Sequence, residues 1–168
     1  MLSVARWVLR ALLVLNLFVG GVLLLLLLWS FADAPRFAST ITRAFAGRDV
    51  GSLLFWARVV LAVVAPVMIA AHLLFRNLLA MLGTVEAGDP FVPANAARLQ
   101  TVAWCLLAIQ VCDLLFGWAA TEFDTLAGER TSGWSPGITG WVAVLLVFVL
   151  ARVFREGARL RDDAELTI

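Results

Sequence analysis

Charge is scarce in this sequence, and lysine is missing altogether. Only 15% of the residues are charged, against about 25% in a typical soluble domain. The formal net charge of +1 argues against direct nucleic-acid binding, which needs a strongly basic surface. The hydrophobic share of 62% and the mean hydropathy of +0.96 indicate an integral membrane protein instead.

Residues that hold cofactors are equally scarce. The single histidine, His72, excludes paired histidine ligation of a haem. Cys105 and Cys112 would lie about 10.5 Å apart along a helix, which is too far for a disulfide between them. They also lack the close spacing of a zinc or iron–sulfur motif. Without a phosphate-binding glycine loop or a nucleophile beside a base, we expect no cofactor, no metal and no enzymatic activity.

What the sequence has in plenty is long apolar runs. A helix needs about 20 apolar residues to cross a bilayer, and four stretches approach or exceed that length. They cover approximately residues 11–32, 53–75, 99–121 and 138–154, and leave a tail at 155–168. Because backbone polar groups in lipid must bond within their own segment, each stretch should be helical. We predict an all-α integral membrane protein with four transmembrane helices in a single domain, residues 1–168. The first stretch exceeds the length of a signal peptide core, which is about 7 to 15 residues, so we expect a retained anchor.

Arginines give the predicted orientation. Eight lie in the N-terminus, the middle loop and the tail, and five lie in the other two loops. Positively charged residues are more frequent on the cytoplasmic side of a membrane, so this distribution favours cytoplasmic termini.

A short helix is expected between the first two spans. Asp33 and Pro35 are typical of a helix start and Gly47 of a helix end. One apolar side chain recurs every four residues, at Phe37, Ile41 and Phe45. This stripe predicts an interfacial helix that lies flat on the membrane, in either a mechanical role or that of a ligand-gating lid.

The connection between the second and third spans is GDPFVPANAARLQ. Gly88 supplies a turn, and Asp89 before Pro90 can cap a helix start. Alternatively the helix begins at Pro93, with Asn95 in its first turn, because a residue before proline is disfavoured in a helix. The aromatic side chain of this loop, Phe91, either plugs the cytoplasmic end of the bundle or docks a partner.

The fourth helix is expected to continue into the tail. Arg152, Arg155 and Arg159 recur at spacings of three and four, so they share a face. Arg155 and Arg159 repel each other unless anionic headgroups lie beside them, each interaction being worth roughly 1 kcal/mol. The chain then becomes acidic and ends in an apolar segment that could pair with another chain or fray.

These two cytoplasmic motifs resemble those of the bacterial domain-of-unknown-function 2975 family of small four-helix membrane proteins. The loop motif comprises Gly88, Pro90, Phe91, Asn95 and Leu99. The tail motif comprises Gly157, Leu160, Asp163, Glu165, Leu166, Thr167 and Ile168. The family has no established activity, so the resemblance implies no catalytic residue. It implies a protein of the bacterial inner membrane that is often encoded beside a small helix-turn-helix regulator of the Cro type. We therefore expect the residues of the tail motif to dock that regulator, together with Asp89, Pro90, Phe91 and Asn95 of the loop.

The rival hypothesis is a small oligomeric transporter or a proton- or ion-coupled protein. Its main support is Asp113, because an ionisable group near the middle of a span costs on the order of 3 kcal/mol. Counted from the cytoplasmic ends of their spans, Asp113 and Arg58 lie at depths of roughly 21 and 27 Å. They could therefore form an ion pair, since the long arginine side chain can reach inward. Alternatively, Asp113 could relay protons or ions. Gln110, one turn earlier, would face the same way.

Two further polar residues fall in the spans. Asn16 and His72 lie at shallow depths of roughly 9 and 6 Å. They are expected to hydrogen-bond between the first two helices, or His72 could titrate as a sensor.

Overall fold

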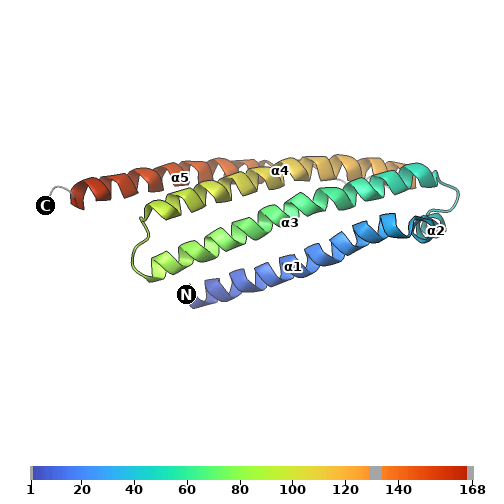
Figure 1. The fold of residues 1–168 in the computed structure, drawn as a ribbon. Coiled ribbons are helices and arrows are strands. Elements are labelled where there is room, and N and C mark those ends of the chain that lie inside the picture. Colours follow the sequence, from blue (N-terminus) through green and yellow to red (C-terminus); the bar gives the residue numbers. More distant parts are fainter. Residues whose placement is uncertain (1, 129–133, 166–168) are drawn as a thin grey trace. The chain divides into compact units, whose positions relative to one another are not determined.

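The computed structural model describes residues 2–128 and 134–165, with side chains through Arg161. Within these residues the chain forms helices and no strand (Figure 1). The helices are α1 (Leu2–Ala32), α2 (Ala34–Ala44), α3 (Val50–Glu86), α4 (Pro93–Ala127) and α5 (Ile138–Glu165). The predicted all-α fold is confirmed. Several of these helices are long and apolar enough to span a membrane, namely α1, α3, α4 and the part of α5 from Ile138 to Arg161. The chain is therefore a multi-pass membrane protein.

The helices extend beyond the predicted spans. Each span lies inside one helix, and α3 with its 37 residues is about 55 Å long. The hydrocarbon core of a bilayer is about 30 Å thick, so apolar runs mark only the part of a helix that suits lipid. Polar residues continue α3 and α4 past that thickness at their ends. As expected, α5 continues through its arginines.

The short helix α2 begins and ends as its sequence predicts. Asp33 is the N-cap, and its Oδ1 accepts a hydrogen bond from the Arg36 amide at 3.3 Å. Pro35 lies in the first turn, and Gly47 follows the helix with a positive φ of 81°.

Two residues of the predicted apolar stripe, Phe37 in α2 and Phe45 at its C-cap, contact other aromatic side chains of the protein. Phe37 is buried and packs edge-on against Trp29, with ring centroids 5.5 Å apart. Phe45 packs in the same way against Phe123, also at 5.5 Å. Because these contacts cover much of the stripe, its interfacial placement stays a prediction.

A second cap fixes the start of α3. Asp49 Oδ2 accepts a hydrogen bond from the Ser52 hydroxyl at 2.6 Å, and Oδ1 accepts one from the Gly51 amide at 3.1 Å. Both bonds favour the ionised carboxylate, so the pKa of Asp49 is lowered, chiefly by Ser52 and then by Gly51.

The helices pack in two compact units. One contains residues 2–17, 69–110 and 137–165, and the other contains 18–68, 111–128 and 134–136. Small residues dominate the buried positions of the first unit, including Ala70, Ala96, Ala103, Ala151 and Ala158. Small side chains allow helices in a membrane to approach closely. Most large apolar side chains of α1 are exposed, as expected for a surface that faces lipid.

Candidate interaction surface on the α3–α4 loop and α5

The loop that follows α3 begins with a helix-terminating turn. Gly88 adopts a positive φ of 81°, where a side chain would be strained. The Asp89 amide donates to the Thr84 carbonyl at 3.0 Å, and the Gly88 amide donates to the Val85 carbonyl at 3.1 Å. This pair of bonds is the Schellman arrangement, which satisfies carbonyls at a helix end. The turn predicted at Gly88 is therefore confirmed.

Asn95 ties the end of α3, the loop and the start of α4 together. Helix α4 begins at Pro93, which settles the two helix starts predicted for this segment. Asn95 is fully buried, and its amide nitrogen donates to Thr84 Oγ1 at 2.6 Å and to the Pro90 carbonyl at 2.9 Å. Its amide oxygen accepts a hydrogen bond from Arg98 at 2.9 Å. Both donors of the amide group and its oxygen are thus used, so the loop is held in one conformation.

Phe91 lies against α5. Its ring centroid is 5.2 Å from that of Phe154, with the rings tilted by 32°. A Cβ at Gly157 would lie 3.3 Å from Phe91 Cδ1, so the glycine makes room for this ring. Phe91 nevertheless remains 44% exposed. The side chain of Leu160, three residues after Gly157 on α5, is 62% exposed. Phe91 therefore presents an apolar face to the surroundings while resting on α5.

Charged side chains reinforce this contact. Asp89 in the loop forms an ion pair with Arg161 of α5, beside the Phe91 contact. A separate ion pair joins Glu86 at the end of α3 to Arg6 of α1. We call Asp89, Phe91, Phe154, Gly157, Leu160 and Arg161 the loop–tail surface. The residues Leu166, Thr167 and Ile168 of the predicted docking site lie outside the described residues, as do the side chains of Asp163 and Glu165.

The family model described as "Protein of unknown function (DUF2975)" matches residues 6–168, which is nearly the whole chain. The chain belongs to the DUF2975 family. The resemblance found in the loop and tail motifs is thereby confirmed. No curated protein and no solved structure shows significant similarity to this DUF2975 chain.

The ion pair expected in the spans of this DUF2975 protein is not formed. Asp113 is half-buried and makes no ion pair with the side chains that the structure describes. Arg58 contacts α1 instead, where its guanidinium donates to the Ser30 carbonyl and lies 4.4 Å from the centre of the Phe31 ring. These contacts hold the guanidinium on α1, so the predicted Asp113–Arg58 pair is wrong.

The other polar residues singled out in the spans are Gln110, His72 and Asn16. Gln110 lies against Gly140 of α5, where an added side chain would collide with its amide. His72 Nδ1 is buried without a hydrogen-bond partner in the described part of the chain, and Asn16 lies half-buried in α1. Among the described residues, no group of three or more His, Cys, Asp or Glu side chains could hold a metal ion.

Three residues of the DUF2975 loop–tail region were not predicted as site residues. Thr84 and Arg98 bind Asn95, and Arg161 binds Asp89. The spacing of three between Asn95 and Arg98 places them on one helix face, and this signal could have identified Arg98. Thr84 and Arg161 reach their partners across a loop and between helices, for which a single sequence carries no signal.

Proposed function

We propose that this DUF2975 protein is a non-enzymatic membrane interaction protein whose loop–tail surface binds a small helix-turn-helix transcription regulator. The observation that carries the proposal is the contact of Phe91 with Phe154 and Gly157. It joins the two motifs of the chain that lie outside the predicted spans into one surface. The described residues thus provide an apolar centre with a charged pair beside it, a common composition for a protein interface.

The charge of the tail supports a basic partner. After Arg161 the sequence continues with Asp162, Asp163 and, after one alanine, Glu165. A DNA-binding regulator has a basic face for the phosphate backbone, and acidic side chains complement such a face. Binding at the tail would then compete with DNA, so the membrane protein would hold the regulator away from its operator. This requires both termini to face the cytoplasm of the bacterial inner membrane, as the arginine distribution predicts.

The test is affinity purification of the detergent-solubilised native protein, followed by mass spectrometry. A variant that combines Phe91→Ala with deletion of residues 162–168 should lose the copurified regulator. With the regulator in hand, Phe91→Ala alone should weaken binding by about 1–2 kcal/mol, or about 5- to 30-fold, as for an aromatic side chain at the centre of an interface. The matched control is Phe18→Ala, which removes an exposed ring from α1 and should leave binding unchanged. Equal binding by the Phe91 variant and the native protein would contradict the proposal.

A second function is favoured by one observation. Asp113 is a half-buried carboxylate within a span, and it has no ion-pair partner among the described residues. Ionisable residues in spans often mark a proton or ion path. As an alternative we propose an oligomeric proton- or ion-coupled transporter, in which Asp113→Asn abolishes flux into liposomes while Phe91→Ala does not. The opposite order of effects supports the interaction protein.

A further inference from the structure

A basic groove runs between α4 and α5, separate from the contact of Phe91 with Phe154. It consists of two hollows of about 270 and 400 Å³ that share Gln100 and Arg155. Ala96 and Ala158 line the first hollow and Ala151 lines the second, and all three are buried. Because these side chains are small, the helix surfaces between the longer side chains stay open as a groove.

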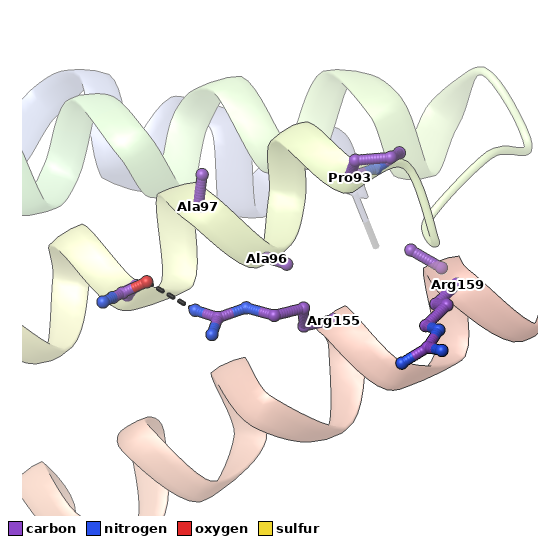
Figure 2. A pocket seen from close by; sticks show the side chains of 7 residues that line it. Pro93, Ala96, Ala97, Arg155 and Arg159 are labelled. Carbon is purple, nitrogen blue, oxygen red and sulfur yellow. Dashed lines mark hydrogen bonds between the residues drawn. The ribbon is translucent and has the colours of Figure 1, made fainter.

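Arg155 is positioned across this groove. Its guanidinium donates to Gln100 Oε1 on α4 at 2.5 Å. Figure 2 shows Arg155 reaching from α5 toward α4, where a dashed line marks this bond. A guanidinium has five N–H donors, so this bond orients Arg155 and leaves further donors for a ligand.

The charge in the groove is predominantly positive. Arg152 and Arg159 lie three residues before and four residues after Arg155, and all three are exposed. None of the three forms an ion pair with a side chain in the described part of the chain, and Glu156 is the one acidic residue that lines either hollow. Arginines three and four residues apart on a helix repel each other. An anion between them would relieve that repulsion and accept several charge-assisted hydrogen bonds.

An apolar surface adjoins the arginines. Phe148 lines the second hollow one turn before Arg152, and its ring packs edge-on against Trp104 with centroids 5.3 Å apart. Trp104 lies one turn after Gln100 on α4 and is 56% exposed. Tryptophan is enriched at the level of lipid headgroups, where one side of the ring meets hydrocarbon. The groove therefore changes from guanidinium groups to aromatic rings along the helices, in the direction of the predicted spans.

We propose that this groove is a binding site for an anionic glycerophospholipid. The phosphate accepts hydrogen bonds from Arg155 and from Arg152 or Arg159, and an acyl chain lies over Trp104 and Phe148. A free phosphate would meet the arginines but leave the rings uncovered, whereas a zwitterionic lipid would bring its own cation to a basic site. The charge and the apolar surface together favour a lipid with net negative charge. The site is distinct from the docking of a regulator by Phe91, and neither proposal depends on the other.

The test is native mass spectrometry of the purified full-length protein, titrated in neutral detergent with phosphatidylglycerol or phosphatidylcholine. We expect one phosphatidylglycerol to bind with about five- to tenfold preference, because each arginine near an anionic lipid contributes about a fivefold change in affinity. Arg155→Gln should lower phosphatidylglycerol binding about fivefold and leave phosphatidylcholine unchanged. The matched control is Arg43→Gln, which removes an exposed arginine from α2.

Further arms identify the source of the anion. Trp104→Ala should also weaken binding of phosphatidylglycerol, while excess inorganic phosphate or glycerol 3-phosphate should fail to displace it. Displacement by either soluble anion would overturn the lipid site in favour of a soluble-anion site. Equal affinity for both lipids, or an Arg155→Gln variant that binds as the native protein does, would also overturn the proposal. Circular dichroism checks folding, and an Arg152→Gln, Arg159→Gln double variant carries the same expectation if Arg155→Gln does not fold.

Discussion

Replacement of Asn95 by alanine should destabilise the protein by about 2–4 kcal/mol. The side chain is fully buried and makes three hydrogen bonds, to Thr84, Pro90 and Arg98. Each such bond contributes about 0.5–1.5 kcal/mol net, and alanine also leaves the Pro90 carbonyl without this donor. Hydrogen bonds between helices inside a membrane average about 0.6 kcal/mol, which lies within the same range. The loss removes the link between the end of α3 and the start of α4.

The assay is reversible unfolding in mixed micelles of mild detergent and dodecyl sulfate, followed by circular dichroism. The matched control is Asn77→Ala, because within the described part of the chain the Asn77 amide donates only to the Leu73 carbonyl of its own helix, at 2.8 Å. This control should change the free energy of unfolding by less than about 0.5 kcal/mol. A Thr84→Val, Asn95→Ala double-mutant cycle should give a coupling energy of about 1 kcal/mol. If Asn95→Ala is no more destabilising than Asn77→Ala, the inferred role of this network is wrong.

Three other perturbations test separate parts of the structure. Gly157→Val should push the Phe91 ring from α5 and cost about 1–3 kcal/mol in the same unfolding assay, with Gly157→Ala milder. The lowered pKa of Asp49 means that its stabilising effect is present above the unfolded value near 3.8 and is lost as pH falls through the folded value. Unfolding measured against pH should therefore show a weaker acid dependence in Asp49→Asn. Arg58→Met should lower the free energy of unfolding by about 1–3 kcal/mol, because Arg58 donates to the Ser30 carbonyl. Asp113→Asn should change it by less than about 0.5 kcal/mol. Similar losses from both variants would support an ion pair between Asp113 and Arg58.

Local features of the fold were predictable because their causes are local. A run of about 20 apolar residues suits a bilayer regardless of what the rest of the chain does. The cap at Asp33 and the turn at Gly88 depend on side chains and φ angles within a few residues. For the same reason the start of α4 at Pro93 was among the two predicted alternatives.

Contacts between helices were much less predictable. The depth of a residue follows from counting along the chain, but its direction depends on the rotation of the helix, at 100° per residue. Asp113 and Arg58 have similar predicted depths, yet Arg58 contacts Ser30 and Phe31. Asn95 was predicted as a docking residue from its motif, while its burial against Thr84 depends on how two helix ends meet.

Phe91 lies in the loop and Asn95 in the first turn of α4, and variants of these two residues should distinguish an effect on stability from an effect on docking. Asn95 supports the loop from within, whereas Phe91 is 44% exposed and rests on Phe154 from outside. Asn95→Ala should therefore lower both the free energy of unfolding and the affinity for the regulator, because a loosened loop no longer holds Phe91 on α5. Phe91→Ala should weaken binding at a stability cost of about 0.5–1.5 kcal/mol, the contribution of an aromatic pair. Both quantities should be measured for both variants in the same detergent. If Phe91→Ala destabilises the protein as much as Asn95→Ala and leaves binding intact, the ring serves the bundle and the docking surface must lie elsewhere.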